Sequence, residues 1–143
     1  MKEKILVTGA SGMVGHAFQR IQPLQNHDFV LVGSKDCDLR DRNATFQLLR
    51  RVRPDYVIHL AAKVGGVKGN TDYVADFYTQ NIQMNTNVLD ASFRYGVQKV
   101  VSLLSTCVYP DTATYPLTED QIHAGPPHIS NFGYAYAKRM RLS

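Results

Sequence analysis

Two pairs of side chains late in the sequence have the types and spacing needed for proton transfer at a carbonyl group. Tyr134 and Lys138 are four residues apart and would share one face of a helix. A free tyrosine has a pKa of about 10, and a neighbouring ammonium group favours its phenolate, so we expect Lys138 to bring Tyr134 toward a working acid–base range. Ser105 and Cys107 stand together in the stretch STCVYP, where Ser105 could hydrogen-bond the reacting oxygen.

Each pair alone also has an ordinary structural explanation. A Tyr-x-x-x-Lys spacing occurs by chance on surface helices, and a single cysteine is most often a small buried residue. The joint arrangement favours chemistry, because the STCVYP stretch follows an apolar run that predicts a buried strand. Ligands of open parallel sheets bind beyond the carboxyl ends of the strands, which is where Ser105 and Cys107 would lie.

A glycine-rich turn near the start of the sequence predicts a dinucleotide site. Gly9, Gly12 and Gly15 follow the pattern G-x-x-G-x-x-G between an apolar strand pattern and a helix pattern. The first glycine permits a tight turn, the second lets a pyrophosphate approach the backbone, and the third lets the helix pack closely on the sheet. The start of the helix would direct its free N–H groups at the phosphates. The alternative is an ordinary strand-to-helix turn without a ligand.

The end of the second strand pattern indicates which dinucleotide is bound. An NAD site calls for an acid there, whereas Ser34 and Lys35 supply a hydroxyl and a cation that suit a 2′-phosphate. Asp36 could be the acid of an NAD site, but it lies farther from the apolar run, so the sequence favours NADP(H); Lys35 could also be a solvated loop lysine. The residues expected to contact the cofactor are Gly9, Ser11, Gly12, Met13, Val14, Gly15, Ser34, Lys35, Asp38, Leu39, Leu60, Ala61, Ala62, Leu103 and Lys138.

Apolar runs that alternate with helical patterns predict an α/β fold with a doubly wound parallel sheet of the Rossmann type. Strands are expected at 4–8, 29–32, 55–61 and 99–104, and helices at 13–22, 41–52, 72–95 and from about 133. Asp41 should cap the second helix and Gly96 should end the third. Residues 65–70 and 110–131 have loop composition. We expect the strand order 3-2-1-4, which leaves the fourth strand at an open edge.

The composition excludes several other classes of protein. The 143 residues are 44% apolar and 20% charged, which is typical of one globular domain, and the net charge of +4 is not gathered in an arginine-rich arm that would point to nucleic acid. Two distant cysteines, Cys37 and Cys107, indicate neither a disulfide framework nor a metal site. With no signal peptide or membrane span in the pattern, we expect a cytoplasmic protein that binds no membrane.

None of the histidines is expected to be catalytic. His59 stands in a strand pattern and should be packed in the core, while His16 and His27 should lie at the surface. His123 and His128 flank a glycine-proline segment in a loop that could approach a substrate.

Together these residues resemble the short-chain dehydrogenase/reductase family, in its extended branch that acts on nucleotide sugars. The resemblance rests on KILVTGASGMVG, VIHLAAKVGGV, STCVYP, YPLTED and GPPH followed by SNFGYAYAKRM, and it covers about residues 4–140. It implies that Ser105, Tyr134 and Lys138 support hydride transfer from NADPH. The Ser-x-Cys step is similar to that of members that convert GDP-4-keto-6-deoxymannose to GDP-fucose by epimerisation and reduction, and it implies that Cys107 is an acid–base group of the epimerisation.

The resemblance has further implications for the rest of the chain. Asn81 would support the active site, although Met84 and Asn85 replace the glycine and threonine usual in its motif. The helix expected at 72–95 and the last helix would form a homodimer interface. In the family, a histidine that partners the cysteine lies downstream, in a C-terminal part that binds the nucleotide sugar. We therefore expect a truncated N-terminal NADP-binding domain over residues 1–143, with exposed apolar surface.

Three functions follow as alternatives. The chain could carry out the epimerisation and reduction, it could bind NADP(H) or a full-length partner without turnover, or it could be another extended-branch epimerase or dehydratase. The thiol of Cys107 favours the first over the third, because those other branches need no thiol there. The absence of the downstream histidine favours the second for the chain as given.

Overall fold

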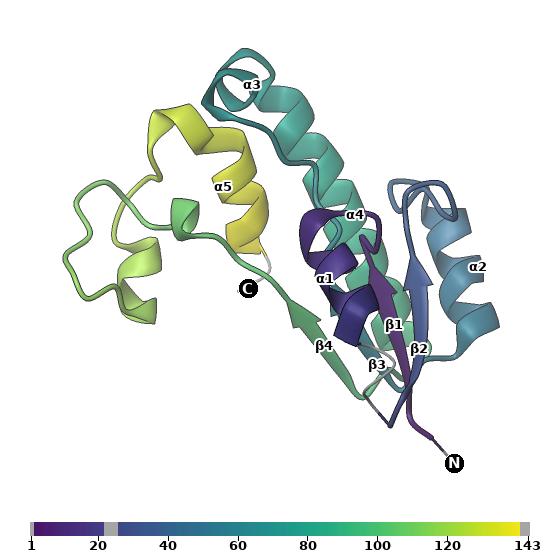
Figure 1. The fold of residues 1–143 in the computed structure, drawn as a ribbon. Helices are drawn as coiled ribbons and strands as arrows, with labels where there is room; N and C mark the ends of the chain where they lie inside the picture. The colour runs from purple at the N-terminus through teal and green to yellow at the C-terminus, as the bar shows by residue number, and fades with distance from the viewer. Residues whose placement is uncertain (1, 22–25, 141–143) are drawn as a thin grey trace. The chain divides into compact units, whose positions relative to one another are not determined.

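The computed structural model describes residues 2–21 and 26–140 (Figure 1). The chain divides into two compact units. The sheet unit comprises Met1–Ala62 and Gln83–Leu103, and the turn unit comprises Lys63–Ile82 and Leu104–Ser143. Every helix in the described part of the chain is too short or too polar to cross a lipid bilayer.

The sheet unit is built on four parallel strands in the order β2-β1-β3-β4 (Figure 1). The strands are β1 (Lys4–Thr8), β2 (Asp28–Val32), β3 (Tyr56–His59) and β4 (Lys99–Ser102). The predicted fold class, a parallel sheet of the Rossmann type, is confirmed, and β4 lies at an edge as expected. The predicted order 3-2-1-4 is wrong, because β3 pairs with β1 and β4 rather than with β2.

The second crossover explains this order. After β2 the chain enters a turn at residues 33–36 that is closed by its own hydrogen bonds, and α2 (Arg42–Val52) then carries it back past β1. The first crossover, through α1 (Met13–Ile21), runs the opposite way, and right-handed crossovers in opposite directions place their helices on opposite faces. The direction of the sheet therefore reverses between β1 and β3, which is the kind of position where nucleotides bind.

One face of the sheet holds the apolar core. Val30, Leu6, Val57 and Val100 are register partners across the four strands and therefore point to the same side. This face packs against α2 and the second half of α4 (Val74–Arg94). The buried cluster there comprises Leu6, Val32, Leu39, Leu48, Leu49, Val52, Val57, Val88 and Ala91.

The predicted caps of two helices are confirmed. The side chain of Asp41 accepts the N–H of Ala44 at 3.1 Å and begins α2. Gly96 follows α4 with a φ of +71°, and the N–H of Val97 returns to Ser92 O at 3.0 Å, which closes the helix end. The predicted strands 55–61 and 99–104 are longer than β3 and β4, because the ladder stops where the chain turns into the loops. The predicted end of the first helix at residues 22–23 lies outside the described residues.

The turn unit contains short helices. They are α3 (Val67–Asp72), the first turns of α4, α5 (Phe132–Arg139) and 3-10 helices at Thr106–Val108, Glu119–His123 and Ile129–Asn131. The start of α5 confirms the last predicted helix. The loop predicted for 110–131 therefore contains regular turns, and Pro110 pairs with Pro127 across it.

The loop predicted at 65–70 is wrong from Val67 on, because that segment forms α3. Asn70 explains how a glycine-rich segment becomes helical: it is buried, and its amide donates to the carbonyls of Gly65 (3.1 Å) and Gly66 (3.3 Å). The chain leaves the helical conformation at Tyr73, with φ −125° and ψ 44°, so the helix predicted from residue 72 is divided there.

Candidate functional site

In the sheet unit, the glycine turn after β1 has the geometry of a close backbone approach. Gly9 has a φ of +73°, which side chains avoid, and a Cβ there would lie 2.6 Å from the backbone nitrogen of Ala61. The N–H of Leu60 donates to Thr8 O at 3.2 Å and holds the chain after β3 at this point. A side chain at Gly9 would therefore push the ends of β1 and β3 apart.

Gly12 is the residue at which α1 begins. Its N–H donates to Gly9 O at 3.0 Å, and its carbonyl accepts the N–H of His16 at 2.8 Å. The N–H groups that follow, from Met13 and Val14, have no acceptor within the helix. Both side chains are exposed, so the start of α1 offers accessible donors to an anion.

Gly15 makes room for the turn itself. It is buried, and a Cβ on it would overlap the backbone of Ala10, so the nearest neighbour is the turn rather than the sheet that the sequence suggested. Ala10 is held by its N–H, which donates to Val32 O at 3.0 Å, and by its carbonyl, which accepts from Gln19 Nε2 at 2.9 Å. The third glycine therefore lets α1 start directly above β1 and β2.

The end of β2 presents Ser34 and Lys35 to solvent. Asp36, the alternative acid, turns its carboxylate back and accepts the N–H of Gly33 at 2.7 Å. Ser11 of the glycine turn lies next to Gly33, since a Cβ built there would be 3.0 Å from Ser11 Oγ. The structure therefore places Ser11 beside the turn that carries the exposed Ser34 and Lys35.

Asp38 and Leu39 follow this turn. Arg40 holds Asp38 with Nη2 2.7 Å from Oδ2 and Nε 2.9 Å from Oδ1, and these hydrogen bonds lower the pKa of the Asp38 carboxyl. Leu39 has its side chain in the core, and its carbonyl accepts the amide of Asn87 at 2.9 Å. Asp38 is thus the more accessible of these two predicted contacts.

The remaining predicted cofactor contacts of the sheet unit follow β3 and β4. Leu60, Ala61 and Ala62 come directly after β3, and Leu103, which is 44% exposed, comes after β4. All are beyond the carboxyl ends of parallel strands, which is the expected side for a ligand.

His59 is a buried core residue, as predicted, and it belongs to a polar chain. Its Nδ1 lies 2.7 Å from Thr8 Oγ1 and its Nε2 lies 3.2 Å from Asn85 Oδ1. Because the Asn85 oxygen only accepts, Nε2 carries the hydrogen and Nδ1 accepts from the Thr8 hydroxyl. This series of hydrogen bonds, from Thr8 through His59 to Asn85, connects β1, β3 and α4. Asn85, which departs from the family motif, therefore has a hydrogen-bond partner in His59.

In the turn unit, Ser105 and Cys107 lie on one tight turn. Ser105 caps the 3-10 helix Thr106–Val108, with its Oγ accepting the N–H of Cys107 at 3.3 Å and its carbonyl accepting that of Val108 at 3.1 Å. The Ser105 hydroxyl accepts this bond and keeps its own hydrogen to donate. Ser105 and Cys107 are partly exposed, as a residue that meets a substrate must be.

Tyr134 and Lys138 lie on α5 with the predicted proximity. Lys138 Nζ lies 5.6 Å from the centre of the Tyr134 ring, and Lys138 is 3% exposed. Gly133 places α5 against α4, since a Cβ at Gly133 would overlap the carbonyl of Val74. Tyr134 itself is half-buried.

Arg139 was not singled out in the sequence, although it connects α5 to the Ser-x-Cys turn. Its Nε donates to Val108 O at 2.7 Å, and the residue is 7% exposed. The signal that could have revealed it is the pair of small residues before it, Ala135 and Ala137, which are buried and mark α5 as a helix packed on more than one side.

Asn81 hydrogen-bonds the backbone at Lys63, the first residue of the turn unit. Its Oδ1 accepts the N–H of Lys63 at 2.8 Å, and its Nδ2 donates to Lys63 O at 3.0 Å and to Phe77 O at 2.7 Å. The amide thus pairs with both backbone groups of Lys63 and is completely buried. Asn81 therefore supports the backbone at Lys63 and Phe77. The active-site role that the resemblance implies for it stays a prediction.

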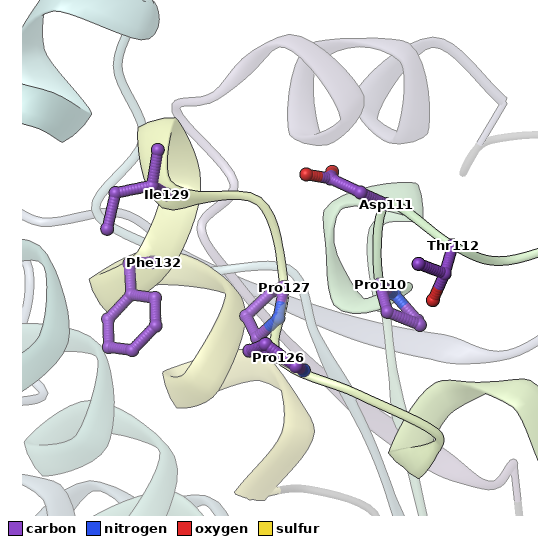
Figure 2. Close-up of a pocket in the computed structure, with 7 residues that line it drawn as sticks. All are labelled: Pro110, Asp111, Thr112, Pro126, Pro127, Ile129 and Phe132. Carbon is purple, nitrogen blue, oxygen red and sulfur yellow. The ribbon is translucent and has the colours of Figure 1, made fainter.

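A pocket of about 380 Å³ opens in the proline-rich part of the turn unit (Figure 2). Figure 2 shows Asp111 and Thr112 on one side of it, Ile129 and Phe132 on the other, and the prolines between them. The nearby His128 is exposed, and its Nδ1 accepts the N–H of Ser130 at 3.1 Å, so this ring caps a 3-10 helix.

The cysteines lie in different surroundings. Cys37 belongs to the sheet unit, and burial, together with the nearby carboxylates of Asp38 and Asp41, raises the pKa of its thiol. Cys107 belongs to the turn unit, and both thiols are free. In the described ranges, no cluster of His, Cys, Asp and Glu side chains could hold a metal ion.

Comparison with known sequences identifies a family over most of the chain. The profile of the NAD dependent epimerase/dehydratase family matches residues 5–142. A GDP-L-fucose synthase of Dictyostelium discoideum is 47% identical over 142 residues, and a probable GDP-L-fucose synthase of Drosophila melanogaster is 46% identical over 141 residues. These alignments cover 97% and 96% of this chain but 44% of each relative, so the chain spans less than half the length of these curated relatives.

Solved structures with similar folds carry similar names. A GDP-L-fucose synthetase of Naegleria fowleri bound to NADP superimposes with a TM-score of 0.88 at 48% identity, over 96% of this chain and 45% of that one. A dTDP-4-dehydrorhamnose reductase of Bacillus anthracis in complex with NADP superimposes with a TM-score of 0.85 at 25% identity, over 98% of this chain and 49% of that one. The chain therefore has the fold of a part of these proteins that makes up somewhat less than half of their length.

Proposed function

The chain belongs to the NAD dependent epimerase/dehydratase family, and from this premise we propose that residues 1–143 are the N-terminal NADP(H)-binding domain of an enzyme with GDP-L-fucose synthase activity. That activity epimerises GDP-4-keto-6-deoxy-D-mannose and reduces it to GDP-L-fucose. The observation that carries the proposal is the turn unit, where a Ser-x-Cys turn is hydrogen-bonded to the helix that bears the Tyr-x-x-x-Lys pair. A thiol beside a reductase triad suits a reaction that both moves protons and reduces a ketone.

The sheet unit fits a dinucleotide phosphate. A Cβ at Gly12 would lie 3.3 Å from Gly9 O, so the glycines keep the surface of the turn open to a pyrophosphate. The exposed Lys35 supplies a cation for a 2′-phosphate, and Asp36, already bonded to Gly33, is less suited to ribose hydroxyls. These features support NADP(H) over NAD(H). When bound, the cofactor supplies the hydride for the reduction.

Cys107 is proposed to move protons at the carbons beside the sugar ketone. Such an exchange needs an acid–base group that can reach the substrate, and the thiol is partly exposed on its 3-10 turn. The neighbouring Ser105 hydroxyl would donate to the ketone oxygen and stabilise the enolate that forms when a proton is removed.

Tyr134 and Lys138 are proposed to serve the reduction. Tyr134 would give its phenolic proton to the ketone oxygen, and the ammonium of Lys138, 5.6 Å from the ring centre, would stabilise the resulting phenolate. Ser105 would hold the same oxygen, so both halves of the reaction share one oxygen site.

A homodimer in the cytoplasm is part of the proposal. Tyr78 in the turn unit is 43% exposed and Phe93 in the sheet unit is 86% exposed, so each unit has an exposed aromatic side chain that an assembly would cover. Sedimentation velocity of the protein measures the mass directly, and a monomer at all concentrations would contradict this part of the proposal.

The central experiment has two arms. The first is titration of the chain with NADPH, with NADH as control; saturable binding that prefers NADPH is expected. The second is incubation with GDP-4-keto-6-deoxy-D-mannose in D₂O, followed by mass spectrometry. Deuterium in the sugar reports epimerisation, and oxidation of NADPH reports reduction.

The outcomes separate the three alternatives. Deuterium uptake together with NADPH oxidation supports the synthase activity. NADPH binding without uptake or oxidation assigns the chain a binding role only. Deuterium uptake without NADPH oxidation would indicate another epimerase or dehydratase of the extended branch, and no NADPH binding at all would overturn the proposal.

A further inference from the structure

We propose that Arg139 is a positioning residue for Cys107, holding the turn that carries the thiol at a fixed place relative to the Tyr134–Lys138 face of α5. The inference rests on the proposed function, in which Cys107 moves protons while Tyr134 and Lys138 serve the reduction. It adds a residue to which neither the sequence motifs nor the comparisons assign a part.

The contact that carries the inference is one hydrogen bond. Arg139 Nε donates to the carbonyl of Val108 at 2.7 Å, a charge-assisted bond of good length. Val108 is 1% exposed and directly follows Cys107, so the bond fixes the Val108–Tyr109 peptide, one residue beyond the thiol. The other bonds of the turn come from within it, between Ser105 and residues 107–108. Arg139 therefore supplies an anchor from a separate element.

The burial of Arg139 indicates that the bond to Val108 O is part of the packed interior of the turn unit. The residue is 7% exposed, and its guanidinium also lies 5.3 Å from the Tyr136 ring centre. Among the described residues, its buried Nη2 finds no hydrogen-bond partner. A buried arginine with an unpaired N–H is costly, and an apolar side chain of similar length would fill the same space without that cost. What the arginine supplies and an apolar residue cannot is the donor to Val108.

The position of Arg139 along α5 links the two parts of the proposed chemistry. It directly follows Lys138 and is five residues after Tyr134, so all three move as parts of one helix. α5 is itself held at its start, where Gly133 packs on the carbonyl of Val74. A displacement of α5 would therefore shift the thiol turn and the Tyr–Lys face together rather than separating them.

The test measures the reactivity of the two cysteines with iodoacetamide in the 143-residue chain, by mass spectrometry of the peptides that contain them. Cys37 lies in the sheet unit and is the internal reference. The variants are Arg139→Met, which keeps length and removes the donor, and Arg139→Lys, which keeps a donor. Arg94→Met is the matched control, because Arg94 is a surface residue that pairs with Asp90.

The proposal predicts a local effect. Loss of the hydrogen bond in Arg139→Met should raise the alkylation rate of Cys107 about tenfold, in line with a bond to a charged donor. In Arg139→Lys the rate should stay closer to that of the unchanged chain, because the ammonium can still reach Val108 O. Cys37 should react at the same rate in every variant, and Arg94→Met should change neither thiol.

Three results would overturn the proposal: an unchanged Cys107 rate in Arg139→Met, an equal rise at Cys37, or the same rate in Arg139→Lys as in Arg139→Met. If circular dichroism shows that Arg139→Met is unfolded, Arg139→Gln, whose Nε2 is as many bonds from Cα as Arg139 Nε and can still donate to Val108 O, is compared with Arg139→Ala. Cys107 must then react faster in the alanine variant, and equal rates overturn the proposal.

The readout separates this inference from the proposed function. Alkylation needs neither cofactor nor sugar, so failure to bind NADPH would count against the function alone. An unchanged Cys107 rate in an Arg139→Met chain that still binds NADPH would count against the positioning role alone.

Discussion

The sheet unit and the turn unit are stabilised internally by different kinds of interaction. In the sheet unit, parallel ladders and an apolar cluster under α2 and α4 fix the backbone. In the turn unit, polar side chains bind the backbone directly: Asn70 at Gly65 and Gly66, Asn81 at Lys63, and Arg139 at Val108. The proposed proton-transfer groups all lie in the turn unit.

The difference predicts which property, stability or reactivity, a substitution in each unit should change. A packing defect in the sheet unit lowers the free energy of unfolding and weakens cofactor binding, because the ladders and core act as one. A lost polar clamp in the turn unit frees a short backbone segment, which alters reactivity before it alters global stability. The predictions below test this division, beginning with the largest expected effect.

Cys107→Ser should give the largest effect and should leave the sheet unit untouched. A serine hydroxyl is a far weaker acid than a thiol, so in the whole enzyme that contains this domain deuterium uptake into GDP-4-keto-6-deoxy-D-mannose should fall about 10²–10⁴-fold, while NADPH affinity stays the same. Cys37→Ser is the matched control and should leave uptake unchanged. Uptake that survives Cys107→Ser would remove the turn unit from the proton transfer.

Gly9→Ala should destabilise the sheet unit by roughly 3 kcal/mol or more, since it combines a positive φ with a clash against Ala61. Gly96→Ala is the control: Gly96 has nearly the same φ, +71°, but no atom lies within 4 Å of its added Cβ. It should cost about 1 kcal/mol. Urea denaturation of both variants measures the difference, and equal losses would show that the close approach to Ala61 has no energetic weight.

Asn81→Ala should release the backbone at Lys63, at a cost of about 1–3 kcal/mol for the polar groups left unpaired. Asn87→Ala is its counterpart in the sheet unit, where the amide donates to two backbone carbonyls, Leu39 O at 2.9 Å and Arg40 O at 3.0 Å. Asn81 binds three backbone groups, including an N–H. Hydrogen exchange of the Lys63 amide and urea denaturation should show the greater loss in Asn81→Ala. A greater loss in Asn87→Ala would contradict the contrast between the two units.

Lys35→Ala should reduce the preference for NADPH over NADH by about tenfold, the value expected for one charge-assisted contact to a phosphate. Isothermal titration with both cofactors measures it, and Lys68→Ala, at an exposed lysine of the turn unit, is the control. Affinity for NADH should not change. Equal weakening toward both cofactors would place Lys35 away from the 2′-phosphate.

The smallest effect is expected at Asp90, which joins α4 to α2. Hydrogen bonds from Arg94 and then from Arg42 lower the pKa of the Asp90 carboxyl below its usual 3.8. A group with a lowered folded pKa stabilises the fold above its unfolded pKa and loses that effect as pH falls through the folded pKa. Below pH 3.8, the Tm of the unchanged chain should therefore fall slightly more steeply than that of Asp90→Asn, and parallel curves would show that this exposed pair has no effect.

Much of the sheet unit could be predicted from the sequence, because its signals are local. Apolar runs marked the strands, Asp41 marked the start of α2, and Gly96 marked the end of α4. The strand order could not be obtained in this way, because it depends on which edge of β1 the second crossover reaches. The helix α3 was missed because Asn70, a residue typical of loops, stabilises it through side-chain bonds to Gly65 and Gly66.

The residue types of the candidate site could be predicted from the sequence, but the residues that hold them in place could not. The proximity of Lys138 to Tyr134 follows from helical spacing, and the position of Cys107 beside Ser105 follows from adjacency in the chain. Arg139 could not be identified, because its contact with Val108 joins residues that are distant in the sequence. The roles of all these residues stay predictions until the experiments above are made.

The edge of the sheet also has a practical consequence. In the described part of the chain, β4 is paired only with β3, and Val101 on its outer face is 45% exposed. An edge strand of this kind accepts a further strand through its backbone groups. The chain is therefore suited to fragment complementation: a synthetic peptide with alternating apolar residues, supplied in trans, could dock on β4 and act as a switchable second half of a split protein.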